Sequence, residues 1–252
     1  MKLLEWNIHK MTNKIPVKDF VCKRILELDN KADIICLVEY IDDNKIRNRL
    51  KDEYWINESI SESGNKILIA ISKLISSKKP QVVRETEETG CYNFLHVKCV
   101  IDELEKELSI IGIRMLSPMD ASKQTPPLNK YLKTIEGSFV CVGDFNIKEY
   151  RMGHWFDLTN YKIETLQKSN DKIENFSYIY IDKQSKIVSS YGAVDHVLGS
   201  SDLEISSKYK WDFLSDDDIY PQKDDIKINR TVWDIKPAYP DHAIMITDIR
   251  FD

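Results

Sequence analysis

The chain has 252 residues, a net charge of −5 and an isoelectric point of about 5.7. Its hydrophobic fraction of 42% and charged fraction of 31% are ordinary for a soluble globular protein and allow one large domain or two small ones. The acidic balance argues against a protein that coats nucleic acid by charge alone, because such binding needs clustered Lys and Arg. It does not exclude an enzyme whose phosphate contact is local and metal-mediated.

The cysteine pattern indicates a reducing compartment. No CxxC spacing occurs, so a zinc knuckle is not expected. The N-terminus has no signal-peptide hydrophobic region, and no apolar run approaches the length of a membrane span. We therefore expect a cytoplasmic protein with no stable membrane association. The five cysteines, all in apolar runs typical of core positions, are Cys22, Cys36, Cys91, Cys99 and Cys141.

The first half of the chain predicts strands, most of them consecutive. Residues 3–8 predict a strand that brings Asn7 to its end, and residues 34–38 predict an unbroken apolar strand that ends at Glu39. Strands in a row favour an antiparallel or mixed sheet over a sheet that alternates with helices. Helices are predicted over 17–28 and 42–50, and further strands over 66–71, 81–84, 92–100 and 108–115.

The most informative stretch lies at residues 138–146. Phe139 to Val142 predict a short strand buried on both faces, after which Gly143 permits a sharp turn. Asp144 and Asn146 follow two residues apart, so they point the same way if the extended conformation persists. A carboxylate can take a proton from water and a carboxamide can orient that water, although both residues are also ordinary in turns. Before this strand we expect a polar loop over 115–127, with three prolines, and a helix over 128–135.

The last third of the chain is harder to read. A polar hairpin is predicted over 179–188, a short strand with Asp195 over 193–199, and a final strand over 243–249. His154 and Trp155 are expected in a loop, where they either stack on a substrate base or belong to the core. The acidic run 216–218 is expected to be a solvated loop rather than a Ca²⁺ loop. No linker, low-complexity tract or repeat divides the chain, so a single domain over 1–252 is expected.

Polar side chains recur at the ends of apolar strands or inside them. Glu39 offers hard oxygen to Mg²⁺, and Asp144 can act as a base toward an attacking water. His242 can stabilise charge on phosphoryl oxygens if a carboxylate such as Asp195 orients it and favours its protonated form. The full set, which suits hydrolysis of a phosphate ester, is Asn7, Glu39, Asp144, Asn146, Asp195, Asp241 and His242.

These residues carry a resemblance to a known superfamily. It covers the chain from residue 6 to the final strand and implies an α/β (α+β) fold, a four-layer α/β-β/α sandwich of two mixed, mainly antiparallel sheets flanked by helices. The resemblance also implies a site at one rim of the sandwich. The motifs Trp6-Asn7, Val38-Glu39, Gly143-Asp144-Phe145-Asn146, Val194-Asp195-His196 and Asp241-His242 resemble, in order, those of the endonuclease/exonuclease/phosphatase superfamily.

The resemblance implies a role for each matched residue. Asp144 activates or positions the nucleophilic water, and Asp195 orients His242. By the same match, His196 is a strand residue without a catalytic role. The implied catalytic residues are Asp144, Asn146, His242, Asp195 and Asn7; the phosphate contacts are Arg114, Asn146 and His242; the ligands of Mg²⁺ or Mn²⁺ are Glu39, Asn7 and Asp241.

The sequence departs from the superfamily pattern at two positions. Arg114 falls where members present a His or Tyr toward the scissile phosphate. It is either a bidentate phosphate ligand or the partner of a nearby carboxylate. Pro240 stands where a serine commonly precedes the Asp-His pair, a minor backbone change. His9, two residues after Asn7, is either a rim residue of the site or a surface residue.

The resemblance implies a divalent-metal-dependent phosphoesterase. The favoured activity is that of a nuclease, endonuclease or exonuclease, which hydrolyses phosphodiester bonds with an activated water in a nucleic acid that is bound locally. A lipid or small-molecule phosphodiesterase or phosphatase of the same superfamily is the alternative. A non-catalytic binding module on this fold is the second alternative, and the sequence leaves the oligomeric state open.

Overall fold

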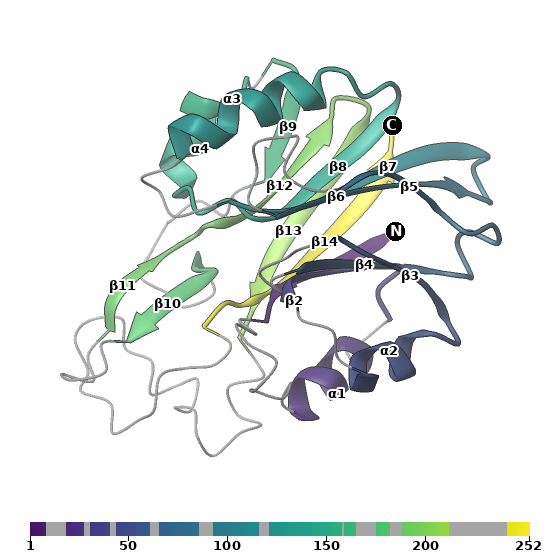
Figure 1. Ribbon diagram of the computed structural model, residues 1–252. Helices are drawn as coiled ribbons and strands as arrows, with labels where there is room; N and C mark the ends of the chain where they lie inside the picture. Colours follow the sequence, from purple (N-terminus) through teal and green to yellow (C-terminus); the bar gives the residue numbers. More distant parts are fainter. Residues whose placement is uncertain are drawn as a thin grey trace.

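Two six-stranded sheets form the centre of the structure (Figure 1). In the first sheet the order is β13-β14-β1-β2-β4-β3, with β1 and β2 parallel and the other neighbours antiparallel. Its strands are β1 (Lys2–Asn7), β2 (Ile34–Tyr40), β3 (Tyr54–Glu58), β4 (Lys66–Ser72), β13 (Leu203–Lys210) and β14 (Ile244–Phe251). The computed structural model describes residues 1–8, 19–27, 31–40, 44–60, 66–85, 93–115, 121–157, 159–164, 175–181, 188–211 and 241–252.

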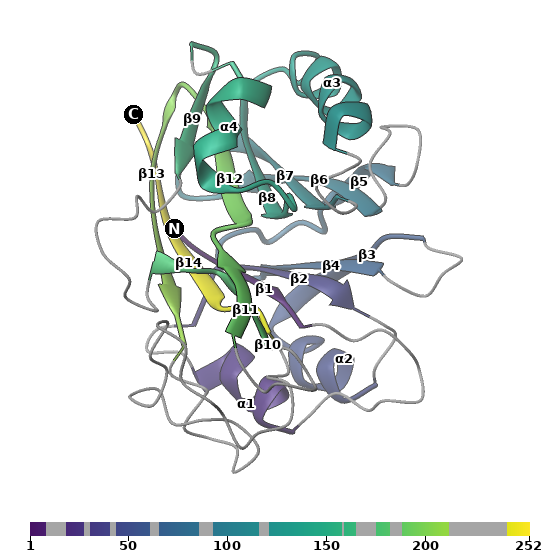
Figure 2. The ribbon, with the colours of Figure 1, turned by 90° about the vertical axis from the view of Figure 1, so that its left-hand side faces the viewer.

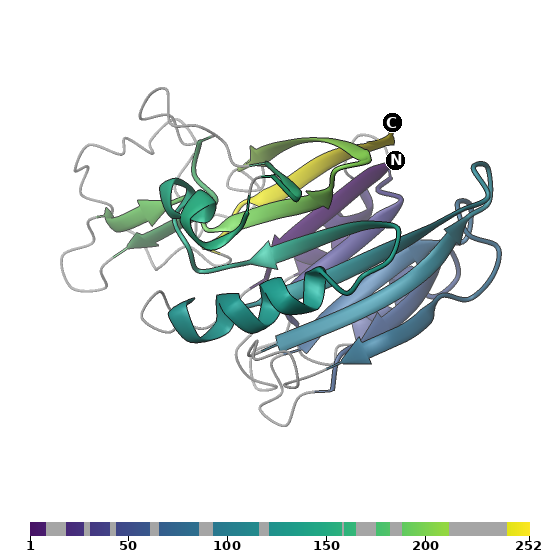
Figure 3. The same cartoon turned by 90° about the horizontal axis from the view of Figure 1, so that it is seen from above.

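The second sheet is built in the same way. Its order is β5-β6-β7-β8-β12-β9, with β7 and β8 parallel. Its strands are β5 (Gln81–Glu85), β6 (Asn93–Ile101), β7 (Lys106–Arg114), β8 (Ser138–Asp144), β9 (Tyr161–Glu164) and β12 (Asp195–Ser200). A separate antiparallel hairpin consists of β10 (Tyr178–Ile181) and β11 (Val188–Gly192), so the predicted hairpin exists but extends beyond the predicted range 179–188. This hairpin projects beyond one end of the sheets, and both chain termini lie at the other end (Figure 3).

Helices cover the outer face of each sheet and complete four layers (Figure 2). The first sheet is covered by α1 (Asp19–Glu27) and α2 (Asn44–Leu50), and the second by α3 (Ala121–Leu132) and α4 (Glu149–Trp155). The predicted four-layer sandwich of two mixed, mainly antiparallel sheets is therefore confirmed. No helix in the described part of the chain has both the length and the apolar character that a bilayer crossing needs.

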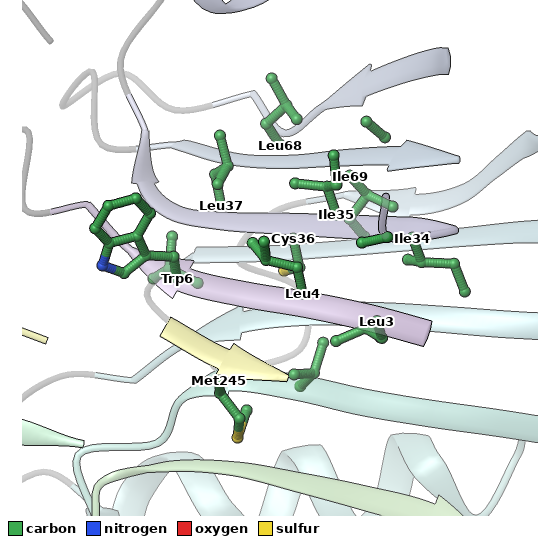
Figure 4. Packing of buried hydrophobic residues seen from close by; sticks show 14 of the residues in the cluster. Leu3, Leu4, Trp6, Ile34, Ile35, Cys36, Leu37, Leu68, Ile69 and Met245 are labelled. Atoms are coloured by element: carbon green, nitrogen blue, oxygen red, sulfur yellow. The ribbon is translucent and has the colours of Figure 1, made fainter. Parts of the chain in front are cut away.

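Burial on both faces explains the unbroken apolar runs of the central strands. Along β7, Ile110 packs in a cluster that fills the space between the two sheets and continues to α1 and α2, whereas Ile111 packs in a second cluster with Leu128 and Leu132 of α3. Adjacent residues of one strand thus enter different cores, since side chains alternate across a sheet. Figure 4 shows part of the first cluster, in which Leu3 and Leu4 of β1 lie beside Ile34 and Ile35 of β2.

The structure corrects several predicted elements. The predicted loop 115–127 is wrong from Ala121 onward, and the predicted helix 128–135 begins and ends too late, because α3 spans Ala121–Leu132 and contains Pro126 and Pro127. The helix tolerates these prolines because the carbonyls that lose a partner belong to residues 122 and 123, which are exposed and can bind water. His154 and Trp155 lie in α4 and not in a loop. Four predictions, on His9, Cys91, Asp216–Asp218 and Pro240, fall outside the described residues.

Candidate active site

Strand direction brings the predicted residues to one edge of the sandwich. Asn7 ends β1, and Asp144 ends β8. Asp195 begins β12, which runs antiparallel to β8, and it pairs in register with Asp144. His242 immediately precedes the residues that lead into β14, which runs antiparallel to β1. Residues far apart in the sequence therefore meet where strands of both sheets begin or end.

The Asp144 carboxylate is held by three N–H donors. The Asn7 amide donates to Oδ2 over 3.1 Å, and the Asn146 amide donates to the same oxygen over 3.0 Å. The Asn146 backbone N–H donates to Oδ1 over 2.9 Å. The Asn146 amide also donates to the Met115 carbonyl over 2.8 Å, which fixes its orientation. The carboxylate is thus oriented before any substrate binds.

The turn that presents Asp144 differs from the predicted one. Gly143 lies inside β8 with a φ of 141°, and a Cβ at this position would lie 2.0 Å from the Ile113 carbonyl oxygen. Glycine is needed here because the ends of β7 and β8 approach closely. The sharp turn occurs at Asn146, whose φ of 50° is left-handed. Asn146 therefore folds back onto Asp144, and the extended conformation that we expected ends at Asp144.

Asp195 and His242 form a buried hydrogen-bonded pair. His242 Nδ1 lies 2.8 Å from Asp195 Oδ2. The backbone around the pair is fixed as well, since the Trp6 indole N–H donates to the His242 carbonyl over 3.0 Å. On the other side, the Tyr209 hydroxyl donates to the Asp195 carbonyl over 2.5 Å, and the Ser177 hydroxyl accepts the Asp195 backbone N–H over 3.0 Å. These contacts hold the imidazole in one orientation.

Asp144 and His242 both have raised pKa values, for different reasons. Burial raises the pKa of Asp144 to about 7, although the His242 charge opposes the rise. Burial also works to lower the pKa of His242, but the Asp195 carboxylate outweighs it, so the pKa of His242 is raised well above 6.5. At neutral pH Asp144 can accept a proton, whereas His242 is protonated and can donate.

A carboxylate that the sequence analysis missed lies behind this pair. Glu5 is fully buried, and neither of its carboxylate oxygens has a hydrogen-bond partner among the described residues. Burial raises the pKa of Glu5 well above 4.5, and the Asp195 charge raises it further. Its position two residues before Asn7 on the same strand face was the signal that could have found it.

Glu39 and Arg114 meet across the two sheets. The Arg114 Nε donates to Glu39 Oε1 over 2.6 Å, and the two side chains are only 19% and 4% exposed. Regular alternation along β2 would turn Glu39 away from the second sheet, because Cys36 faces Gly112 of β7. A left-handed φ of 53° at Glu39 and a register shift between Leu37 and Tyr40 break this alternation. Of the two alternatives for Arg114, the carboxylate contact is the one present.

The donor set suits a hard divalent cation. Asp144, Asp195 and His242 each offer a ligand atom within 4.8 Å of the others, so this group can hold a metal ion. Asp195 Oδ1 is buried and has no hydrogen-bond partner among the described residues. Carboxylate oxygens are the ligands that Mg²⁺ prefers. His242 is a poorer ligand than the carboxylates, since its ring is protonated and already engaged by Asp195. Asp241 lies next to His242 in the chain and adds to the rise of its pKa.

Two other histidines are separate from this cluster. The ring of His196, in β12, donates Nε2–H to the Ile147 carbonyl over 2.7 Å and packs against Phe145. Burial lowers the pKa of His196, so it is neutral. His154 is exposed and lies edge-to-face with Trp155 at the end of α4. Neither is hydrogen-bonded to Asp144 or His242.

Comparison with solved structures extends over the whole chain, whereas no protein-family profile and no curated protein matches the sequence. TDP2 from D. rerio, complexed with a single-strand DNA product, matches 99% of this chain over 98% of its own, with 13% identity and a TM-score of 0.67. The catalytic domain of human nocturnin with bound sulfate matches 100% of this chain over 93% of its own, with 15% identity and a TM-score of 0.67. An endonuclease/exonuclease/phosphatase from Bacteroides vulgatus matches 100% of this chain over 98% of its own, with 13% identity and a TM-score of 0.65. The chain therefore has the fold of the endonuclease/exonuclease/phosphatase superfamily, as its motifs predict.

Proposed function

We propose that this protein is a divalent-metal-dependent phosphoesterase, and specifically a nuclease that hydrolyses phosphodiester bonds with an activated water. The observation that carries the proposal is the Asp144 carboxylate, held by three N–H donors beside the Asp195–His242 pair. A carboxylate with a pKa of about 7 is matched to taking a proton from water at neutral pH.

The other side chains of the cluster act on the charge that develops during hydrolysis. The protonated His242 ring donates toward the phosphoryl oxygens, and Asp195 keeps the ring charged and oriented. Asn7 and Asn146 orient Asp144 through their amides. Preorganised donors of this kind act without reorganisation at the moment of reaction.

The metal requirement follows from the acidic donor set. In this proposal Glu39 is the main protein ligand, with Asn7 and Asp241 as the further ligands that the resemblance implies. Asp144, Asp195 and His242, which could also hold a cation, serve the acid–base chemistry instead. A bound Mg²⁺ or Mn²⁺ polarises the phosphoryl group and offsets the negative charge of the phosphate. The carboxylates of the site, without such a cation, would repel that phosphate.

Nucleic acid is the proposed substrate because basic and aromatic side chains lie next to the cluster. A cavity of about 280 Å³ is lined by Asn146, Lys148, Tyr150, Arg151 and Trp155. Tyr150 is 68% exposed, and the Arg151 guanidinium lies 5.6 Å from the centre of its ring. Exposed aromatic rings stack on bases, and basic side chains contact phosphates. The D. rerio TDP2 structure, which holds a single-strand DNA product, supports the same substrate class.

A substrate panel tests the proposal. The purified protein is incubated with Mg²⁺ or with EDTA and with plasmid DNA, abasic duplex, RNA and phosphoinositides. We expect cleavage of DNA or RNA with Mg²⁺ and none in EDTA, and Asp144→Asn controls for contaminating nucleases. Turnover of phosphoinositides alone would replace the nuclease by the lipid phosphatase alternative. Absence of turnover of every substrate would favour the remaining alternative, a non-catalytic binding module on this fold.

A further inference from the structure

The contact between Arg114 and Glu39 joins the residue proposed to bind the cation to the residue expected to bind the phosphate. The Arg114 Nε lies 2.6 Å from Glu39 Oε1, and the pair connects β7 of the second sheet to β2 of the first. Both charges are largely removed from water. A mostly buried ion pair is strong only while each partner keeps a counter-charge, because a lone buried charge is costly. Neither residue can leave the other without a replacement.

A second donor lies next to Arg114 at the same edge. Asn93 begins β6 and pairs in register with Arg114. Alternation along β6 places Asn93 on the same face as Leu95 and Val97, which pack between the sheets. Asn93 is buried, and its amide Nδ2 has no hydrogen-bond partner among the described residues. A buried donor without an acceptor is unfavourable, and an anion at this position would satisfy it.

We propose that Arg114 couples cation binding to phosphate binding: its guanidinium holds Glu39 in the ligand-free protein and moves to the substrate phosphate, beside Asn93, when a divalent cation takes Glu39. The proposal rests on the proposed phosphoesterase function. A guanidinium and a divalent cation repel each other at one carboxylate, so they compete for Glu39. A phosphate gives the guanidinium a bidentate acceptor of the same kind in exchange.

Reciprocal linkage gives this exchange a measurable signature. Phosphate must raise the affinity for the cation by the same factor by which the cation raises the affinity for phosphate. A superfamily member with His or Tyr at this position has no permanent cation to release from Glu39. Arg114, which replaces that His or Tyr in this chain, would therefore make tight cation binding at Glu39 depend on the presence of substrate.

Mn²⁺ binding measures the coupling without any turnover. Free Mn²⁺ is titrated by electron paramagnetic resonance against the whole protein, with and without inorganic phosphate. The variants are Arg114→Gln, which removes the charge, and Arg114→Lys, which keeps it. Arg84→Gln is the matched control, since Arg84 belongs to the same sheet but lies over the Tyr131 ring, away from the site. Circular dichroism checks that each variant is folded.

We expect phosphate to tighten Mn²⁺ binding about tenfold in the unmodified protein and in Arg84→Gln. Arg114→Gln should bind Mn²⁺ about tenfold more tightly without phosphate and lose most of the coupling, whereas Arg114→Lys should keep the weak binding. Equal Mn²⁺ affinity in Arg114→Gln and the unmodified protein would overturn the coupling while leaving the proposed function intact. Absence of Mn²⁺ binding in every variant, with phosphate present, would overturn the proposed function as well.

Discussion

At the scale of single residues, the site depends on two groups that both have raised pKa values but play opposite roles. Asp144 is a carboxylate that can be protonated near neutral pH, and His242 is an imidazole that stays protonated there. Each shift has a visible cause, burial for Asp144 and the neighbouring Asp195 for His242. An acid and a base side by side are what hydrolysis with a water nucleophile needs.

Replacing Asp144 should therefore affect the chemical step. Asp144→Asn keeps the shape of the side chain but cannot accept a proton, so we expect kcat to fall by about 10²–10⁴-fold with little change in KM. Steady-state kinetics on the best substrate of the panel measure this. Glu107→Gln, an exposed carboxylate of the same sheet, is the control. Turnover near that of the unmodified protein would remove Asp144 from the site.

The pH profile follows from the same two groups. Asp144 must be deprotonated, so kcat/KM should rise as the pH passes about 7. His242 must be protonated, so the rate should fall again only above its raised pKa. The rising limb should disappear in Asp144→Asn. A flat profile between pH 6 and 8 in the unmodified protein would contradict the assignment of Asp144 as the base.

Glu5 predicts a pH dependence of stability rather than of rate. Its pKa is raised in the folded state, so the folded protein binds the proton more tightly than the unfolded chain. The stabilising contribution is complete below about pH 4.5 and is lost as the pH rises toward the folded-state pKa. Relative to Glu5→Gln, the unmodified protein should lose up to about 1.4 kcal/mol of unfolding free energy per pH unit in that window. Urea unfolding of both proteins from pH 5 to pH 8 measures the difference, and parallel curves would contradict it.

At the scale of elements, the sequence predicted best those strands that are buried on both faces. The runs 34–38 and 139–142 are unbroken apolar segments, and both became central strands. The strands β3 and β13 were missed because they are the outermost strands of the first sheet and carry polar residues that resemble loops. Helix α3 was misplaced because two prolines indicated a loop. The strand ends supplied the candidate residues, whereas the expectation that the site lies at one rim came from the resemblance to the superfamily.

Contacts between distant elements could not be predicted from the sequence. The meeting of Glu39 with Arg114 depends on a left-handed residue in β2 and on the packing distance between sheets. The support of the Asp195–His242 pair by Trp6, Ser177 and Tyr209 likewise comes from distant segments. Such contacts follow from tertiary packing, and no local pattern encodes them.

The end of β8 gives a prediction at this scale. In Gly143→Ala the new Cβ would meet the Ile113 carbonyl oxygen of β7, so the strands must separate. We expect a loss of about 3 kcal/mol or more in unfolding free energy, together with a loss of activity because Asp144 is the next residue. Gly137→Ala is the matched control, since Gly137 also has a positive φ but nothing lies within 4 Å of its Cβ. That variant should lose only about 1 kcal/mol in the same chemical unfolding experiment, and equal losses would contradict the steric argument.

At the scale of the whole molecule, the site belongs to both sheets at once. Asn7, Glu39 and His242 come from the first sheet or its border, and Arg114, Asp144 and Asp195 from the second. Three hydrogen bonds between these residues cross the space between the sheets: Asn7 to Asp144, Arg114 to Glu39, and the Asp195–His242 pair. The geometry of the site therefore depends on how the two sheets pack, and a substitution in the shared core can change activity without touching the site.

The net charge of −5 affects how the whole molecule binds a nucleic acid. An acidic protein gains nothing from long-range attraction, so binding must come from the few cations beside the site, Arg114, Lys148 and Arg151. For a single strand, about three phosphate contacts predict a slope near −2 in a plot of log affinity against log salt concentration. Fluorescence anisotropy of a labelled oligonucleotide with Asp144→Asn, between 50 and 200 mM salt, measures this slope. Adding Arg151→Gln should reduce it by about 0.7, whereas Lys133→Gln, an exposed lysine just beyond α3, should leave it unchanged. A slope several times steeper, insensitive to Arg151, would show that a broad surface rather than this cavity binds the strand.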